Sequence, residues 1–506
     1  MAAMVHVISP RKSDTHLAYL NEMRAFGGAA LTTGLTDDVI RDFIDNDYTD
    51  LVVAIERGYA RFLELRESHA DYLALDEMAQ IDEAHGGLTN FYEEDAVNPY
   101  VAVSAAGPWV VSLKGAVVYD CGGYGMLGLG HVPDSVQDAM CKPHVMANIM
   151  TASISQVDFI ACLKQEIGHT LPEGTPYASF ICLNSGSEAM SMASRIADIN
   201  ARVLTDPGSK HEGKEIRGLT LKGSFHGRTD RPARFSDSTA GKYAKYLASY
   251  RDRDYLLTVE PNDIESLEAV FAAAENEGMF IEAFFMEPVM GEGNPGMAIR
   301  PEFYARAREL TREHDTMFVV DSIQAGLRAH GVLSVVDYPG FEGLDAPDME
   351  SYAKAINAGQ FPLSVLALSE IAADTYRRGL YGNTMTSNPR ALDVAIAVLM
   401  SFDDERRENI RARGAELVAG LQSIADETDA IESAQGTGLL ISCALAPRYK
   451  AYGANSTEDY LRRNGLGVIH GGEHSLRYTP VFDITSREVD LIVQLTKDAL
   501  LFGPTH

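Results

Sequence analysis

Basic residues are scarce in this chain, which has 43 Lys and Arg against 72 Asp and Glu and a formal net charge of −29. A surface of that sign repels phosphate backbones and anionic headgroups, so we expect neither a nucleic acid nor a membrane as a partner. Cysteine is scarce as well, and the five residues are Cys121, Cys141, Cys162, Cys182 and Cys443. Their scattered pattern lacks metal-ligand spacing and predicts reduced core thiols in a cytoplasmic protein without a metal site.

Long apolar runs are also lacking, and no uninterrupted stretch approaches the length that crosses a bilayer. The N-terminal residues contain no apolar signal-peptide core, so we expect neither export nor a membrane span. Proline is missing from residues 11–98, which are rich in Asp and Glu. Within them Val52, Ile55, Tyr59 and Phe62 recur at helical spacing. This spacing predicts a helical accessory layer with one apolar stripe and no chemistry of its own.

The chain of 506 residues is too long for one small core, and from residue 177 it alternates strand-like and helical stretches. That alternation predicts an α/β fold with a mostly parallel sheet covered by helices on both faces. In such sheets, ligands bind outside the carboxyl ends of the strands. The residues that follow strand-like runs are therefore the first candidates for a site.

Two such candidates, Asp321 and Lys354, lie in the stretch from Thr316 to Lys354. The apolar run 317–320 ends on Asp321, which would place a buried carboxylate beside a ligand. Lys354 has apolar neighbours, and desolvation by such neighbours lowers the pKa of an amine and favours a Schiff base. Taken alone, an Asp after a strand is more often a helix cap, and a Lys is more often solvated.

A turn of small residues, Asn184–Ala189, follows another strand-like run and precedes a helical pattern. Free amides and the positive end of the helix dipole meet at such a turn, so Gly186 and Ser187 suit a phosphate. A plain serine cap explains the same residues equally well. Phe225 and His226 lie on a glycine-bounded loop, which suits either stacking on a flat ring or ordinary core packing.

Gly123–Gly128 matches G-x-G-x-x-G, the dinucleotide fingerprint. The fingerprint requires a helix that opens on the last glycine, but Gly130 and Pro133 follow almost at once. The region about 20 residues further on also lacks the acidic residue that would hold a ribose hydroxyl. A glycine-rich loop is therefore the better interpretation, and an NAD-dependent dehydrogenase is the weaker alternative.

The order of these segments resembles the class III, or ω-, aminotransferases, which are pyridoxal phosphate enzymes of the aspartate aminotransferase fold. The matching set is Asn184–Ala189, Phe225–Gly227, Glu287–Pro288 with Gly291–Gly293, Asp321 with Gln324, Lys354, and Thr384 with Asn388–Pro389. It lies within residues 99–500, and its order is more specific than any of its parts. The resemblance implies PLP fold type I, an α/β large domain with a mostly parallel central sheet plus a smaller α+β domain built from both chain ends.

The resemblance also implies roles for single residues. Lys354 would be the catalytic Schiff-base lysine for pyridoxal 5′-phosphate, and Asp321 would pair with the ring nitrogen and keep the ring an electron sink. The other implied cofactor-binding residues are Gly186, Ser187, Phe225, His226, Gln324 and Thr384. Thr384 would reach the phosphate of a neighbouring subunit, which implies a homodimer with shared sites. Arg477 would bind the carboxylate of 2-oxoglutarate and Glu292 would neutralise it at other times, unless Arg477 is a plain surface residue.

The expected organisation is a helical extension over 1–98, small-domain parts over 99–165 and 391–506, and a large cofactor-binding domain over 166–390. The implied reaction is ping-pong transfer of an amino group from an amine or ω-amino acid, of the lysine, ornithine or 4-aminobutyrate type, to an oxo acid. A PLP-dependent aminomutase or lyase and a catalytically silent cofactor-binding protein remain alternatives. Ser322 stands where the family usually has an acidic residue, a departure that concerns the substrate pocket more than the cofactor.

Overall fold

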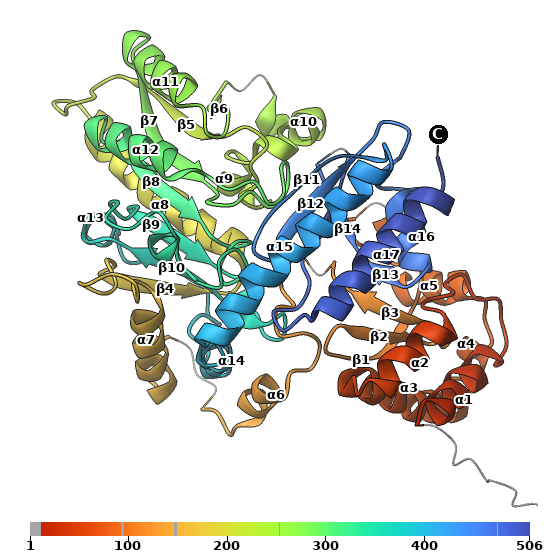
Figure 1. The fold of residues 1–506 in the computed structure, drawn as a ribbon. Coiled ribbons are helices and arrows are strands. Elements are labelled where there is room, and N and C mark those ends of the chain that lie inside the picture. The colour runs from red at the N-terminus through yellow and green to blue at the C-terminus, as the bar shows by residue number, and fades with distance from the viewer. Residues whose placement is uncertain are drawn as a thin grey trace, which may run out of the picture.

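The computed structural model describes residues 12–92, 96–122, 124–145, 149–251, 254–472 and 474–505. Its centre is a seven-stranded sheet with the strand order β4-β10-β9-β8-β7-β5-β6 (Figure 1). The strands are β4 (Ser179–Leu183), β5 (Glu215–Leu221), β6 (Leu256–Val259), β7 (Met279–Met286), β8 (Met317–Asp321), β9 (Met349–Tyr352) and β10 (Ser364–Leu368). Strands β6, β5, β7, β8 and β9 pair in parallel, whereas β10 runs antiparallel to both β4 and β9. The expected mostly parallel sheet is confirmed.

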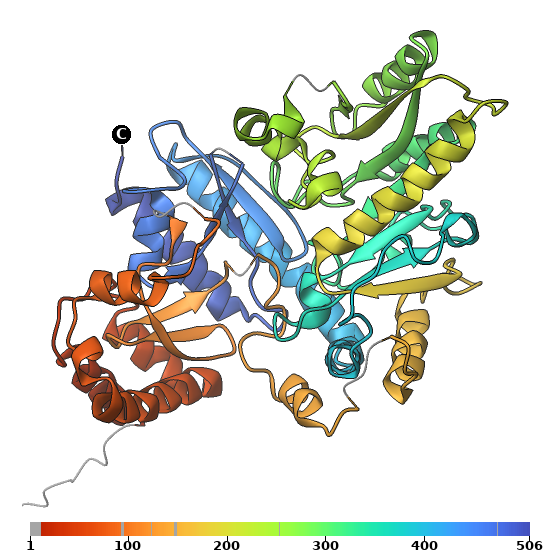
Figure 2. The same cartoon turned by 180° about the vertical axis from the view of Figure 1, so that it is seen from behind.

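Helices cover both faces of this sheet, which is why its strands are apolar on both sides. Alternate residues of a strand point to opposite faces, so Phe284 packs with one core cluster and Phe285 with the other. Helix α8 covers the face seen in Figure 2, and α12 covers the face seen in Figure 1. The helices of this part are α8 (Gly186–Thr205), α9 (Asp230–Ala233), α10 (Asp237–Tyr246), α11 (Ile264–Asn276), α12 (Pro301–Glu313) and α13 (Glu370–Thr375).

Two smaller sheets lie beside the central one, and the first of them combines segments from both ends of the chain. The first has the order β1-β2-β3-β13 and the second β11-β12-β15-β14. Their strands are β1 (Ala102–Ala106), β2 (Trp109–Ser112), β3 (Val117–Asp120), β11 (Ile431–Thr437), β12 (Leu440–Leu445), β13 (Leu466–Gly467), β14 (Ile469–Gly471) and β15 (Ser475–Tyr478). The accompanying helices are α6 (Asp134–Cys141), α7 (Ile154–Glu166), α14 (Pro389–Met400), α15 (Asp404–Glu427), α16 (Thr457–Arg463) and α17 (Ser486–Phe502).

The N-terminal helices pack against the first small sheet, as the red and orange segments of Figures 1 and 2 show. They are α1 (Lys12–Arg24), α2 (Asp37–Asp45), α3 (Thr49–Ser68), α4 (Ala70–Leu73) and α5 (Glu77–His85). The predicted apolar stripe lies on α3, where Val52, Ile55 and Phe62 are buried. Gly58 lets this helix approach β2 closely, because a Cβ there would lie 3.2 Å from Val111 Cγ1.

The structure bears on two expectations, which concern a membrane span and the cysteines. Within the ranges that the structure describes, none of the helices combines the length and the apolar character that a membrane crossing needs. All five cysteines are free, and Cys121 and Cys443 are buried. The prediction of a core thiol is wrong for Cys141, which is exposed because it lies at the end of the short surface helix α6.

Candidate active site

A cavity of about 300 Å³ lies beyond the carboxyl ends of the central strands, the place where α/β sheets hold ligands. Each strand delivers a different group, because Asp321 ends β8, Lys354 follows β9 and Glu287 follows β7. The predicted residues that line this cavity are Gly186, Ser187, Phe225, His226, Asp321, Gln324 and Lys354. Gly186 and Lys354, which are 168 positions apart in sequence, therefore meet in one pocket.

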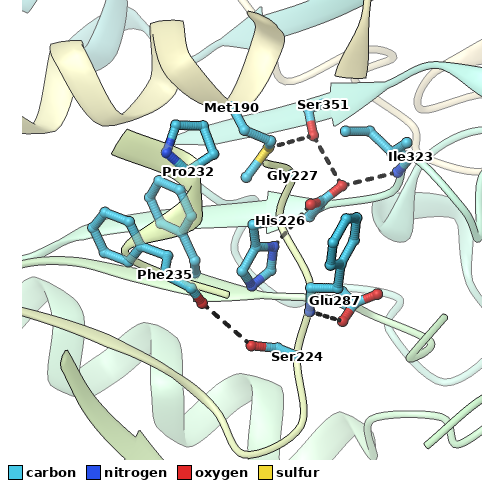
Figure 3. A network of polar contacts seen from close by, with 12 residues as sticks. Met190, Ser224, His226, Gly227, Pro232, Phe235, Glu287, Ile323 and Ser351 are labelled. Atoms are coloured by element: carbon cyan, nitrogen blue, oxygen red, sulfur yellow. Dashed lines mark hydrogen bonds and ion pairs between the residues drawn. The ribbon is translucent and has the colours of Figure 1, made fainter. Parts of the chain in front are cut away.

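The carboxylate of Asp321 is fixed by three partners. Its Oδ2 lies 2.8 Å from Nδ1 of His226, and its Oδ1 accepts from the Ile323 amide at 3.1 Å and the Ser351 hydroxyl at 3.3 Å. Figure 3 shows His226, Ile323 and Ser351 in this network. Both Asp321 and His226 are buried. A buried carboxylate held in this way presents a fixed negative charge to a cationic ring nitrogen.

His226 was predicted only as a residue that binds the cofactor, and the structure gives it a more specific environment. Its Nδ1 contacts Asp321, and its Nε2 lies 3.1 Å from the hydroxyl oxygen of Thr220. Both ring nitrogens are therefore occupied by protein groups. The imidazole orients Asp321, and this relation between residues 95 positions apart could not be inferred from the sequence.

Lys354 has a left-handed backbone conformation and an amine whose pKa is lowered. It follows the extended residue Ala353 and has φ = 51°, a left-handed conformation that is strained for any residue with a Cβ. The pKa of Lys354 is lowered to about 8, mainly by burial and secondly by the Arg477 cation. The carboxylates of Asp321 and Glu292 act in the opposite direction. The amine is therefore partly neutral near physiological pH, as a nucleophile requires.

Helix α8 provides an anion site at the other end of the cavity. Gly186 and Ser187 are its first two residues, whose amides have no acceptor within the helix. The Ser185 side chain caps the helix by accepting from the Glu188 amide. Close packing requires the glycine, because a Cβ on Gly186 would lie 2.7 Å from Cδ1 of Ile323. Amides at a helix N-terminus, together with the helix dipole, suit a phosphate.

In the sequence Glu287 is only part of the motif Glu287–Pro288, but in the structure it joins two walls of the pocket. Its Oε2 accepts from the Phe225 amide and its Oε1 from the Gly291 amide, each at 3.0 Å. Burial raises the pKa of Glu287 to about 7; the Asp321 carboxylate also raises it, whereas His226 lowers it. Glu287 therefore links the loop of Phe225 to the loop that carries Glu292.

Arg477 lies on β15 and is fully buried, so the alternative of a surface arginine is wrong. Its Nη1 donates to Oε2 of Glu292 at 3.1 Å, to Oε1 of Gln324 at 3.2 Å and to the Gly291 carbonyl. Among the residues that the structure describes, no group accepts from its Nε or Nη2. Buried donors without a partner are rare and costly. Arg477 and Glu292 do not line the 300 Å³ cavity itself, but these two donors are left for an anionic guest that reaches them.

Two residues complete the comparison with the sequence predictions. Thr384 is exposed and does not line this cavity. Arg228 was not predicted, although it follows Phe225–Gly227 directly. Its amide donates to Oγ of Ser187 at 3.3 Å, and its guanidinium carbon lies 5.6 Å from the centre of the Phe225 ring. The signal that could have identified it was a cation immediately after the aromatic loop.

The dinucleotide fingerprint finds no support in the described residues. Gly123 lies outside them, and Tyr124–Gly128 contain turns at Tyr124, Gly125 and Gly128 but no helix. The next helix is α6, which begins at Asp134. A Cβ on Gly128 would lie 2.1 Å from the Phe482 ring, so that glycine serves close packing. The helix that would hold a pyrophosphate on Gly128 is missing from this part of the chain, as the sequence predicted.

The class III aminotransferase family model matches residues 91–500, so the chain belongs to this family of pyridoxal-phosphate-dependent enzymes. The acetylornithine aminotransferase of Mesorhizobium japonicum is 29% identical over 411 residues, which are 79% of this chain and 92% of the relative. Ornithine aminotransferase 2 of Staphylococcus aureus is also 29% identical, over 78% of this chain and 93% of its own length.

Solved structures show the same fold. The ornithine aminotransferase of Toxoplasma gondii superposes with a TM-score of 0.71 at 22% identity, over 86% of this chain and 98% of that one. The resemblance seen in the sequence, the fold type and the cofactor are thereby confirmed. The pocket fits the cofactor by its own chemistry, because an amine with a pKa of about 8, a fixed carboxylate and the open amides of α8 surround one cavity.

Proposed function

We propose that this aminotransferase moves an amino group from an amine or ω-amino acid to a dicarboxylic oxo acid of the 2-oxoglutarate type. The observation that carries the proposal is the buried guanidinium of Arg477, with Nε and Nη2 unpartnered among the described residues. Two parallel N–H donors match the two oxygens of a carboxylate. An oxo acid that brings a carboxylate to this position would satisfy both donors.

Different residues around the cavity would hold different parts of the cofactor. When bound, pyridoxal phosphate supplies a ring that accepts the electron pair left on the substrate carbon. The first amides of α8 would hold the phosphate, and Asp321, oriented by His226, would face the ring nitrogen. Phe225 lines the same cavity and offers a flat surface to the ring. Lys354 would attach the cofactor and then carry a proton, a role that a pKa of about 8 permits.

Glu292 lets one pocket serve two kinds of substrate. Its side chain is 26% exposed, whereas that of Arg477 is inaccessible. Glu292 is therefore the partner that has room to turn away. With an amine donor, the 3.1 Å ion pair keeps the Arg477 charge neutralised. With a dicarboxylic acceptor, Glu292 would leave and the guanidinium would grip the substrate carboxylate, so that the buried cation always has a partner.

Arg228 adds a second cation near the pocket and strengthens the case for substrates that carry carboxylates. Its side chain is exposed, and no carboxylate of the described residues forms an ion pair with it. The relatives in the comparison are named acetylornithine and ornithine aminotransferases, whose named substrates carry an amine and a carboxylate. A donor of the ornithine, lysine or 4-aminobutyrate type would pair its carboxylate with one of the two arginines.

We also propose a homodimer in which Thr384 serves the neighbouring subunit's pocket. Large apolar side chains are exposed on α7 and just before it, at Val145, Ile149, Met150, Ile154 and Val157. Several exposed large apolar side chains on one segment are typical of an interface. Ile149 and Asn383 line the same groove, which places this surface beside the Thr384 loop. Measurement of the molar mass by light scattering tests the dimer, and a monomer would contradict it.

The four segments expected from the sequence, 1–98, 99–165, 166–390 and 391–506, are proposed as the structural units. The pairing of β3 with β13 supports a small domain built from both chain ends. The seven-stranded sheet draws all its strands from residues between Ser179 and Leu368. Limited proteolysis tests these limits, because cleavage should concentrate between the units.

The reaction is tested by its two halves. Incubation with lysine, ornithine, 4-aminobutyrate or a simple monoamine should convert the bound cofactor to its amino form without any acceptor. Addition of 2-oxoglutarate should then restore the cofactor and release glutamate in equal amount. An aminomutase or lyase would instead form product without an oxo acid. If no donor changes the cofactor in a way that an oxo acid reverses, the proposed reaction is wrong.

A further inference from the structure

The segment that follows α5 carries two aromatic rings toward the active site. The rings of Phe91 and Tyr92 lie 4.1 Å apart, and the Tyr92 ring lies 5.8 Å from that of Tyr124 with a 21° angle between their planes. Tyr124 in turn lies 5.2 Å from the guanidinium carbon of Arg477. A row of three rings therefore connects the N-terminal extension with the buried arginine of the pocket.

Phe91 also reaches the second arginine. The guanidinium carbon of Arg228 lies 5.7 Å from the centre of the Phe91 ring and 5.6 Å from that of Phe225. The cation is thus bordered by a ring of the extension and a ring that lines the cofactor cavity. Phe91 is 68% exposed and Tyr92 is 37% exposed, so neither is placed there by burial in the core.

Aromatic faces hold a guanidinium without neutralising it. The ring attracts the cation electrostatically, and the N–H donors at the guanidinium edge stay available for hydrogen bonds. At Arg228, which forms no ion pair with a carboxylate of the described residues, such a partner would instead compete with the substrate, as Glu292 does at Arg477. Phe91 lies against the Arg228 guanidinium and Tyr92 against the Tyr124 ring, and a ring beside a cation weakens screening by water on that side. Both arginines are thereby kept oriented and charged for an incoming carboxylate.

We propose that Phe91 and Tyr92 are positioning residues that set the affinity of the pocket for carboxylate-bearing substrates, through Arg228 and through Tyr124 and Arg477. The inference rests on the proposed function, because it needs a carboxylate guest. It assigns a role in specificity to the end of the helical extension, which the sequence predicted to carry no chemistry. The rings act through the arginines, and neither ring lines the cofactor cavity.

Calorimetric titration of the cofactor-loaded enzyme with glutarate, an unreactive dicarboxylate, tests the proposal. Phe91→Ala should weaken glutarate binding by about 3- to 10-fold, the range of one cation–π contact. Tyr92→Ala removes the ring that stacks on Tyr124 and should weaken it by about 3- to 10-fold as well, the range of one aromatic pair. Phe91→Tyr and Tyr92→Phe keep a ring and should restore the affinity. Leu88→Ala is the matched control, because Leu88 is on the same segment and 75% exposed. It should bind glutarate as the wild type does.

Steady-state kinetics supply a second readout. In Phe91→Ala, the KM for 2-oxoglutarate should rise by more than kcat falls, which a general loss of structure would not produce. Wild-type and alanine variants that bind glutarate equally would overturn the role of the rings while leaving the proposed reaction intact. A wild-type enzyme that fails to bind glutarate would refute the dicarboxylate substrate itself, and the inference with it.

Discussion

Replacing Arg477 with Ala removes the guanidinium that we expect to grip the oxo acid. In the structure its Nη1 donates to Glu292, Gln324 and the Gly291 carbonyl. None of the described residues accepts from its Nε or Nη2. The substitution should therefore abolish binding of one substrate carboxylate. It should also leave Glu292 without its cation, so that a carboxylate faces an incoming dianion.

The magnitude follows from two charge-assisted hydrogen bonds, each worth about 1.5–3 kcal/mol. Displacement of Glu292 from its 3.1 Å ion pair offsets part of this gain in the wild type. A net loss of about 3 kcal/mol corresponds to roughly a 150-fold lower kcat/KM for 2-oxoglutarate. The half-reaction with a monoamine donor should change by less than about 5-fold, because that donor brings no carboxylate to the site.

Single-turnover kinetics of each half-reaction measure this difference directly. Arg477→Lys is the matched variant, because it keeps the positive charge and loses the planar fork. It should recover only part of the lost kcat/KM for 2-oxoglutarate. Equal losses in both half-reactions, or no loss in either, would mean that the oxo acid is held elsewhere.

Three further predictions concern the cofactor end of the pocket. Asp321→Asn should keep the His226 contact and the fold but lower kcat by about 100- to 1,000-fold, because the charge facing the ring nitrogen is gone; near-normal turnover would contradict that role. Glu287 has a folded pKa of about 7, above its ordinary value of 4.5, so the stability it contributes is present below pH 4.5 and is lost as the pH rises through 7. Glu287→Gln should therefore gain about 2–3 kcal/mol relative to the wild type between pH 5 and pH 8, seen as a rising melting temperature of the variant relative to the wild type, and a pH-independent difference would refute the linkage. The pKa of about 8 for Lys354 predicts that the apoenzyme reloads with cofactor faster as the pH rises through 8, and a flat rate between pH 7 and pH 9 would count against it.

The sequence predicted those features that depend on short segments. The apolar run before Asp321 is buried on both faces, so its strand and the position of its terminal carboxylate followed from the pattern. The small residues Asn184–Ala189 likewise indicated a turn that leads into a helix, although helix α8 already begins within them, at Gly186. In each case a few neighbouring residues decide the backbone conformation, and the ligand site follows from the end of the strand.

Contacts between residues far apart in sequence determine the features of the site that the sequence could not predict. Arg477 is buried because β15 lies between β12 and β14, and its partner Glu292 comes from a loop 185 residues earlier. The hydrogen bond from the Phe225 amide to Glu287 joins residues 62 positions apart in sequence. The contact of His226 with Asp321 joins residues 95 positions apart. No local pattern encodes such distances. The resemblance to a family predicted the pair of Arg477 and Glu292, but not the burial or the free donors.

Covalent attachment of the cofactor tests the central claim most directly. Reduction of the holoenzyme with borohydride, followed by peptide mass spectrometry, should place pyridoxal phosphate on Lys354. The matched control is Lys222, which lies near Phe225 in sequence but forms an exposed ion pair with Glu260 at 2.5 Å. Lys222→Ala should keep the adduct, and Lys354→Ala should lose both the adduct and transamination. A reducible adduct that persists in Lys354→Ala, or that maps to Lys222, would contradict the account.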